Sequence, residues 1–454
     1  MPPNLLFVWG INDGGSGQLG LGTTAVECNK PRRHLWVEEM LWTGGFGPLV
    51  NGAGLVDIAA GGMHSLLLDE NGIVWSSGVN DDGALGRVTE GVQDPTQGGP
   101  SIHRDIVSCS FRRLQTLVDE GFHAVQIAAG DNTGAAVSGD GELRVWGAFR
   151  HGDGQCLFSD GISHQRLPVS VLKLARKVAG NVERFASVAC GANHIIALTT
   201  HGNVYTWGEG DDGRLGRRIL TRHKPLAQQR EEAIAPRRIV LGPGTRSRKA
   251  VLVSAGKAHS FAVDDSGGVW GWGTNTTGQT GTGYAPDGEL GRGEMVDLPT
   301  RVIGLTPAEL GPPARVVSIA AGDFHTLFLT SEGEVYACGQ RGYGCLGLPD
   351  EHEAFQESEH GMAFISTPAL VEFHDKEAND PIVSIAAGPR YSMAVTQDGI
   401  LYSWGFGPQG ELGLGKGVEQ SNLPRKVTRR EGSWAVKKVS CGGQHAIGLF
   451  QERP

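Results

Sequence analysis

The sequence contains little that would place the protein outside the cell or in a membrane. Its seven cysteines are odd in number and none belongs to a Cys-x-x-Cys pair, which predicts reduced thiols in a cytosolic or nuclear compartment. No stretch approaches the roughly 18 consecutive apolar residues of a membrane-spanning helix. The first ten residues have neither the charge nor the length of a secretory signal. A soluble intracellular protein with no membrane partner is therefore expected.

The sequence also lacks an excess of positive charge and the common motifs of catalysis. Its 49 acidic and 40 basic residues give a net charge of −9, so only a local segment could attract nucleic acid. It contains no GxxxxGK[ST] phosphate-binding loop, no nucleophile elbow and no zinc-ligand spacing. We therefore expect no enzyme active site, no cofactor and no bound metal.

Glycine, by contrast, is abundant, with 70 residues among 454, while only 7% of residues are aromatic. No Gly-X-Y period and no low-complexity tract accounts for these glycines, so they indicate many tight turns. Many belong to one repeated motif: a small residue, Gly, two variable residues, usually His, and then an apolar strand. Its seven copies begin at Ala60, Ala129, Cys190, Ala255, Ala321, Ala387 and Cys441.

A second motif, a strand that ends in an aromatic residue and Gly, also occurs seven times. Six copies follow the first motif after a short Gly-containing turn, which predicts a β-hairpin. The tryptophans of this motif are expected to pack between neighbouring repeats. The seven copies end at Gly10, Gly78, Gly147, Gly208, Gly273, Gly339 and Gly405, and a short Gly-rich element follows each.

Two unpaired pieces of the repeat lie at the two ends of the chain. Residues 7–10 (FVWG) have no strand before them, and residues 441–450 (CGGQHAIGLF) have no strand after them. Pairing these pieces completes a seventh hairpin and closes a ring, which protects the edges of the sheets. The sequence thus predicts an all-β fold, a seven-bladed β-propeller closed by its N-terminal and C-terminal strands, as a single domain over residues 1–454.

These repeats resemble the regulator of chromosome condensation family over essentially the whole chain. More specific stretches are similar to the family's nuclear exchange factors for the small GTPase Ran, particularly the fungal ones. The resemblance implies a guanine nucleotide exchange factor that performs no bond chemistry and acts by stabilising nucleotide-free Ran. We expect a monomer located on chromatin in the nucleus. The specific stretches are residues 60–65, 79–87, 128–132, 146–150, 202–218 and 440–445.

The resemblance also implies contacts with Ran on one rim of the propeller. They comprise acidic loop residues, histidines of the first motif, and a wedge at residues 150–157, where the third repeat departs from the pattern. Where the animal factors have an aspartate needed for turnover, this chain has Asn193, which keeps the hydrogen bonding but loses the charge. The corresponding residues are Asp13, His64, Asp131, Arg150, His151, Asp153, Asn193, His325 and His445.

Structural explanations for several of these residues stay open. A histidine that recurs at the same position of five repeats could bond the backbone of a neighbouring blade, whatever the function of the protein. Asp13 and Asp131 could be turn residues whose carboxylates accept from their own backbone.

Residues 217–249 form a basic insertion, with ten basic and two acidic residues. Such segregation of charge indicates an anionic partner, and the resemblance implies the acidic face of the nucleosome and nearby DNA backbone, bound in a salt-dependent way. A flexible, solvated loop is the alternative. A basic N-terminal tail for nuclear import is not found in residues 1–6. The predicted nucleosome contacts are Arg217, Arg218, Arg222, Lys224, Arg237, Arg238, Arg246, Arg248 and Lys249.

Two other classes of function compete with nucleotide exchange. The first is a non-catalytic propeller scaffold that binds another protein or another small GTPase. The second is an enzyme with a site in the central channel, which the lack of catalytic motifs disfavours. An exchange assay with Ran separates the first class from the exchange factor.

Overall fold

The computed structural model describes residues 3–13, 15–47, 54–92, 102–174, 177–178, 181–219, 224–242, 248–285, 293–357, 361–429 and 432–453. Two predicted nucleosome contacts, Arg222 and Arg246, lie outside the described residues.

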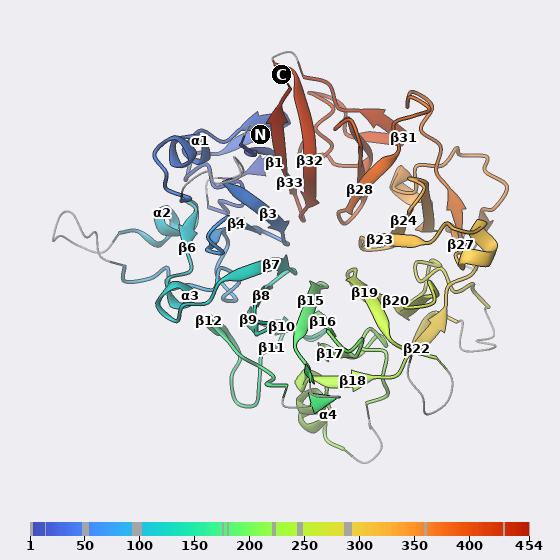
Figure 1. Cartoon of the computed structure of the whole chain (residues 1–454), viewed down its shortest axis with the longest axis horizontal. Coiled ribbons are helices and arrows are strands. Elements are labelled where there is room, and N and C mark those ends of the chain that lie inside the picture. Colours follow the sequence, from blue (N-terminus) through green and yellow to red (C-terminus); the bar gives the residue numbers. More distant parts are fainter. Residues whose placement is uncertain are drawn as a thin grey trace.

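Within these residues, seven sheets of four or five antiparallel strands are arranged around a central channel (Figure 1). The predicted seven-bladed propeller is therefore confirmed. We number the blades along the chain and give the strands of each from the channel outward. Blades 1 to 3 are β32 (Trp434–Cys441), β33 (His445–Glu452), β1 (Leu5–Asn12) and β2 (Val26–Arg33); β3 (Leu55–Ala60), β4 (His64–Asp69), β5 (Val74–Gly78) and β6 (Arg112–Arg113); and β7 (Ala124–Ala129), β8 (Thr133–Ser138), β9 (Leu143–Gly147) and β12 (Gln165–Val169).

Blades 4 to 7 repeat the same order. They are β15 (Phe185–Cys190), β16 (His194–Thr199), β17 (Val204–Gly208) and β18 (Arg237–Ile239); β19 (Ala250–Ala255), β20 (His259–Asp264), β21 (Val269–Thr274) and β22 (Met295–Arg301); β23 (Val316–Ala321), β24 (His325–Thr330), β25 (Val335–Gln340), β27 (Ala363–Leu370) and β26 (Gln356–Glu357); and β28 (Ile382–Ala387), β29 (Tyr391–Thr396), β30 (Leu401–Phe406) and β31 (Gln420–Lys426).

The remaining elements lie on loops between strands. They are α1 (Leu35–Trp42), α2 (Arg104–Ser108), α3 (Gln115–Asp119), α4 (Leu226–Ile234), α5 (Pro307–Leu310), the short helix η2 (Gly342–Gly344), and the hairpins of β10 (Phe149–Arg150) with β11 (Cys156–Leu157) and β13 (Lys177–Val178) with β14 (Asn181–Val182). None of the helices in the described residues is long and apolar enough to cross a membrane. All seven cysteines are described, and none forms a disulfide.

The ring closes as predicted, because β1 and β33 pair antiparallel from Leu5 opposite Phe450 to Gly10 opposite His445. Both chain ends therefore belong to blade 1 (Figure 1). At Gly10 the backbone φ is 103°, and a Cβ would lie 2.5 Å from the carbonyl oxygen of Gln444. The Gly of the second motif is thus required both by its left-handed backbone and by the close approach of the neighbouring strand.

The Gly of the first motif brings the blades together around the channel. A Cβ added to Gly61 would lie 2.4 Å from the carbonyl oxygen of Gly130, and one on Gly130 would lie 2.3 Å from that of Gly191. The same approach recurs around the ring, at Gly191, Gly256, Gly322 and Gly442. Only glycine allows these six strand ends to meet the next blade this closely, and at Gly388, in the seventh repeat, a Cβ would meet the ring of Tyr391.

The second strand of each hairpin-forming repeat is buried along its whole length, as β4, β16 and β24 illustrate. This explains the continuous apolar runs, since neighbouring blades cover both faces of each sheet. The tryptophans tie neighbouring blades together. Trp9 Nε1 donates to the Glu411 carbonyl at 2.7 Å, and Trp146 Nε1 to that of Ala84 at 2.8 Å. Each acceptor belongs to the Gly-rich element of the preceding blade, so the predicted packing between repeats is confirmed.

Candidate interaction site at the mouth of the channel

The central channel opens on one rim into a cleft of about 520 Å³. Loops from several blades line this cleft, and they bring together four of the predicted contact residues. Acidic residues that the sequence analysis did not single out, Asp81, Asp82 and Asp323, also line it, together with Lys257. The four predicted residues in the cleft are His64, Asp131, Arg150 and Asn193.

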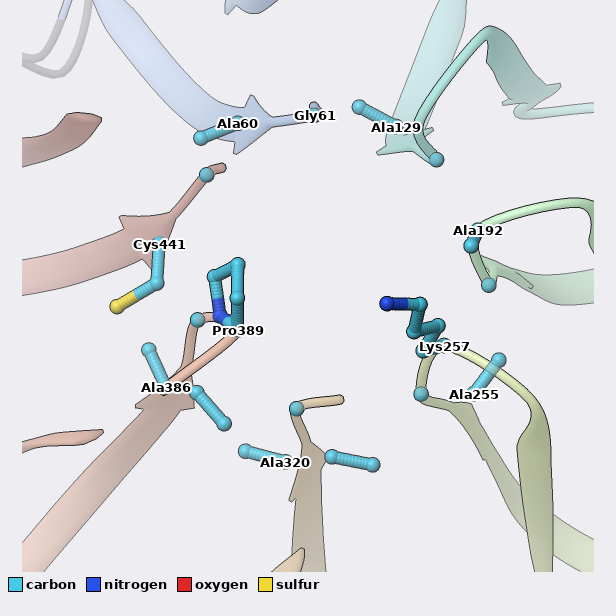
Figure 2. A pocket seen from close by; sticks show the side chains of 18 of the residues that line it. Ala60, Gly61, Ala129, Ala192, Ala255, Lys257, Ala320, Ala386, Pro389 and Cys441 are labelled. Carbon is cyan, nitrogen blue, oxygen red and sulfur yellow. The ribbon is translucent and has the colours of Figure 1, made fainter. Parts of the chain in front are cut away.

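The channel behind the cleft is narrow and lined mostly by Gly and Ala, with a cavity of about 280 Å³. Figure 2 shows Lys257 reaching into this opening from the end of blade 5, opposite Pro389. Its ammonium group lies 2.8 Å from Asp323 Oδ2. Since small side chains leave backbone as the main lining, Lys257 is a main source of charge inside the channel mouth.

Asp131 lies at the edge of this cleft, in the loop between β7 and β8. Solvent reaches it, yet protein atoms surround the carboxylate, and this desolvation raises its pKa, with the negative charge of Asp323 adding to the effect. Lys257, Arg214 and Arg150 oppose the shift. A cation from a binding partner would stabilise the ionised form of this carboxylate, because it would replace the stabilisation that solvating water no longer provides.

Asn193 holds the base of the wedge. Its Oδ1 accepts the backbone N–H of Arg150 at 2.8 Å, so the side chain links the β15–β16 loop of blade 4 to the first residue of the wedge. An aspartate could accept the same hydrogen bond. An aspartate at position 193 would therefore anchor the wedge equally well, because the hydrogen bond needs only an acceptor oxygen. What Asn193 changes, relative to the aspartate of the animal factors, is the negative charge of the cleft.

The wedge itself, residues 150–157, is the β10–β11 hairpin, and its predicted contact residues are fixed from two sides. The Arg150 guanidinium lies 2.6 Å from Asp82 Oδ2 in blade 2. On the other side, Arg230 of α4 lies 2.8 Å from Asp153 Oδ2 and also donates to Gln155. This hydrogen bond from Arg230 lowers the pKa of Asp153.

His151 takes a different place from its neighbours. It is buried, and it lines a groove that it shares with Arg217 and Arg230 of the insertion. Burial lowers its pKa, and the positive charge of Arg230 adds to this effect. The imidazole therefore packs between the wedge and α4, while Arg150 and Asp153 are accessible at the surface.

The recurring histidines lie between blades, which supports the structural explanation. His325 Nε2 lies 2.8 Å from the Ser392 hydroxyl of the next blade, and His445 Nε2 lies 2.9 Å from that of Ser65. At these two histidines the partner of Nε2 is thus a side-chain hydroxyl. The expected interaction with the backbone of the neighbouring blade contributes to the pKa of His64, through Thr133, and to that of His445, through His64. His64 has no hydroxyl partner, because Gly134 takes the equivalent position in blade 3.

Burial keeps these three histidines neutral. It lowers the pKa of His64 and His325 to about 4 and that of His445 to about 3. All three are buried. A direct contact of these rings with a partner stays a prediction, and of the three only His64 lines the cleft.

Asp13 lies outside the cleft, in the loop after β1. Its side chain is exposed, and its Oδ1 accepts the backbone N–H of Ser16 at 2.8 Å, as expected of a turn residue. Gly15, two residues further along this loop, lines a second groove together with Asp81, which also lines the cleft. The structure thus gives Asp13 the role of a turn residue, and its contact with a partner stays a prediction.

The basic insertion is folded in part. Arg217 donates to the carbonyls of Glu232, Ala233 and Ala235 at the end of α4, and Lys224 lies 2.7 Å from Glu232. These two cations are thus used inside the insertion. The predicted contacts that stay exposed are Arg218, Arg237, Arg238, Arg248 and Lys249. Of these, Arg248 also lies 3.6 Å from Asp264 and over the ring of Trp270.

The exposed cations are also spread over the blade and do not form one patch. β17 runs from the rim of the wedge, where Gly208 pairs with His194, to the opposite rim at Gly202. Ala250, directly after Lys249, donates to the Gly202 carbonyl, which places Arg248 and Lys249 toward that opposite rim. Arg237 and Arg238 lie between, on the outermost strand.

Basic pairs on the outermost strand recur in other blades. Arg238 and Arg237 lie opposite Tyr205 and Thr206 of β17, while Lys426 and Arg425 lie opposite Tyr402 and Ser403 of β30. Arg113 and Arg112 lie opposite Trp75 and Ser76 in the same way. Arg237 and Arg238 therefore follow the repeat. Lys249 does too, because Arg184 and Arg315 hold the same exposed position before β15 and β23, where each backbone carbonyl accepts from the residue after the second strand. Among the described residues of the insertion, Arg218 and Arg248 are the exposed cations that have no such counterpart.

The fold and this site define a closed seven-bladed propeller with an acidic, wedge-bearing cleft at the mouth of its channel. Its residues 5–448 match the model of the RCC1-like domain, and the chain belongs to this family. The resemblance inferred from the sequence is thereby confirmed.

Among its relatives, the chain is 31% identical to protein pim1 of Schizosaccharomyces pombe, over 98% of this chain and 75% of the relative. It is 32% identical to the guanine nucleotide exchange factor SRM1 of Saccharomyces cerevisiae, over 97% of this chain and 86% of the relative. A crystal structure of Saccharomyces cerevisiae Prp20p, described with its binding properties to Gsp1p and histones, superposes with a TM-score of 0.78 at 30% identity, covering 100% of this chain and 93% of that one.

Proposed function

We propose that this chain is a guanine nucleotide exchange factor for the small GTPase Ran, acting on chromatin in the nucleus without bond chemistry. The guanine nucleotide exchange factor SRM1, similar over nearly the whole chain, supports the activity. The observation that carries the proposal is the meeting of Asp131, Arg150 and Asn193 in one cleft beside the wedge, since these were predicted as contacts from segments far apart in the sequence.

The acidic cleft suits a partner that has just lost an anion. A GTPase holds the phosphates of its nucleotide with a Lys-bearing loop and Mg²⁺. Once the nucleotide leaves, the lysine is unpaired, and a carboxylate of the cleft, such as Asp131 or Asp81, can take the place of the phosphate charge. Binding that favours the empty GTPase over the loaded one accelerates release, because differential affinity shifts the equilibrium.

The wedge supplies the steric part of this scheme. It is fastened at Asp82, Asn193 and Arg230, so it projects as a rigid hairpin and needs little ordering when the partner binds. A rigid projection can displace the loop that holds the phosphates, whereas a mobile one would yield. We assign partner contacts to Arg150 and Asp153 and the positioning of the wedge to Asn193.

The experiment that tests this function measures the release of fluorescent GDP from Ran mixed with the purified chain. Release that is accelerated by catalytic amounts of the chain supports the proposal. Release at the spontaneous rate, together with binding of another protein through the same cleft, would establish the scaffold function instead.

We also propose that exposed cations of the insertion bind the nucleosome. The binding of Prp20p to histones supports a chromatin partner. Arg218 and Arg248 are the strongest candidates, because the repeat does not account for them, and Lys249 adjoins Arg248. Their contacts would weaken with rising salt as counterions compete for the phosphates and acidic groups.

A further inference from the structure

Beside the wedge, three residues far apart in the sequence bring together a carboxylate, a thiol and an imidazole. Asp82 follows β5 in blade 2, Cys156 belongs to β11 of the wedge, and His164 precedes β12 of blade 3. Their ligand atoms all lie within 4.8 Å of one another. This set includes the three donor types that zinc prefers in proteins.

The two separations that involve Asp82 fit one metal ion. Asp82 Oδ1 lies 3.7 Å from Cys156 Sγ and 3.2 Å from His164 Nε2. Tetrahedral zinc with ordinary bond lengths holds a thiolate and a carboxylate oxygen about 3.6 Å apart, and an imidazole nitrogen and a carboxylate oxygen about 3.4 Å apart. The same carboxylate oxygen faces both other ligands, as a shared centre requires.

The surroundings fit a bound ion as well. The other oxygen of Asp82, Oδ2, accepts from Arg150, which fixes the orientation of the carboxylate and leaves Oδ1 for a ligand role. Such a hydrogen bond to a ligating carboxylate is typical of metal sites. Asp82 is largely buried, with 10% of its side chain exposed, while His164 is 36% exposed, so an ion could reach the cluster from solvent on the side of His164.

We propose that Asp82, Cys156 and His164 form a binding site for a divalent transition metal, zinc by its ligand chemistry. The ion would join the wedge to blades 2 and 3 at the side opposite Arg230. This inference does not rest on the proposed exchange function, because metal binding is measured without Ran. The alternative is a network of hydrogen bonds to Asp82 with no ion, and the experiment distinguishes the two.

The experiment titrates the metal-free, reduced full-length chain with Co²⁺, which substitutes for zinc and reports its ligands by absorption. We expect one ion per chain, the ligand-field bands of tetrahedral cobalt, and a thiolate-to-cobalt charge-transfer band that zinc abolishes by displacement. Cys156→Ser should remove the charge-transfer band. His164→Ala, at an exposed position where folding is not at risk, should weaken binding by at least about tenfold.

Two variants serve as matched controls. Cys190→Ser removes a thiol in the channel wall, and His374→Ala removes an exposed imidazole beside Glu372, both away from the site. Both should bind cobalt as the unchanged chain does. A chain that shows no thiolate band at saturating cobalt, or a band that survives Cys156→Ser, would overturn the proposal and leave the hydrogen-bond network.

Discussion

Arg230 Nη2 lies 2.8 Å from Asp153 Oδ2, and this contact joins the basic insertion to the tip of the wedge. Arg230 is well shielded, with 12% of its side chain exposed, and its other terminal nitrogen donates to Gln155 at 2.7 Å. Two hydrogen bonds from one planar guanidinium fix the direction of the hairpin. The insertion is therefore a structural neighbour of the wedge as well as a source of charge.

Arg230→Gln should slow nucleotide exchange because the wedge loses its support from α4. We expect a decrease of about 3- to 30-fold in the exchange rate on Ran, since misplacing a contact group by an ångström is costly. Lys224→Gln is the matched control, because Lys224 contributes the same charge to the same insertion but pairs with Glu232 of the insertion itself. Equal rates for the two variants would show that Arg230 does not position the wedge.

Asp131→Ala should slow exchange by about 10- to 100-fold, the effect of losing a charged contact worth about 1.5–3 kcal/mol. Folding stability should change by less than about 1 kcal/mol, as for other surface positions. Asp140→Ala is the control, since Asp140 is an exposed turn residue of the same blade at the other rim. A collapse of the melting temperature in Asp131→Ala would mean that the residue is structural.

Stability should fall as the pH is lowered below 6.5. Burial depresses the pKa of His325 to about 4 and of His445 to about 3, so the folded chain keeps them neutral while the unfolded chain protonates them. The unfolded state then binds more protons, and each such histidine contributes up to about 1.4 kcal/mol of lost stability per pH unit. Urea unfolding at pH 7.5, 6.5 and 5.5 measures this, and a free energy of unfolding that stays flat across the series would refute it.

Nucleosome binding should distinguish cations of the insertion from those of blade 7. Arg248→Ala with Lys249→Ala should weaken binding and lower its salt dependence. Arg425→Ala with Lys426→Ala is the control, because that pair is exposed on the outermost strand of blade 7. An equal loss in both double variants would indicate attraction to the whole surface, and exchange on free Ran should be unchanged in both.

The architecture could be predicted from the sequence because each blade repeats the same physical demands. Gly61 and its counterparts permit the close approach of the blades at the channel, and Trp9 and its counterparts pack between neighbouring blades. The strands at the two chain ends, around Gly10 and His445, each lack a hairpin partner in the sequence, so they are expected to pair with each other. The number of blades and their closure follow from these residues alone.

The composition of the cleft could be predicted only in part. Lys257 and Asp323 occupy variable positions of the first motif, where no pattern marks them before the blades are placed around the channel. The cluster of Asp82 with Cys156 was missed for the same reason, since 74 residues separate them in the chain. The available signals were the run at residues 79–87, which contains Asp82, and the wedge at residues 150–157, which contains Cys156.

The most direct test of the central claim compares the binding of nucleotide-free Ran and GDP-bound Ran to the same cleft. Ran stripped of nucleotide should co-elute with the chain in size-exclusion chromatography and dissociate when GTP and Mg²⁺ are added, and Asp131→Lys should abolish the complex. Equal affinity for empty and loaded Ran, or a complex that survives Asp131→Lys unchanged, would contradict exchange through this cleft.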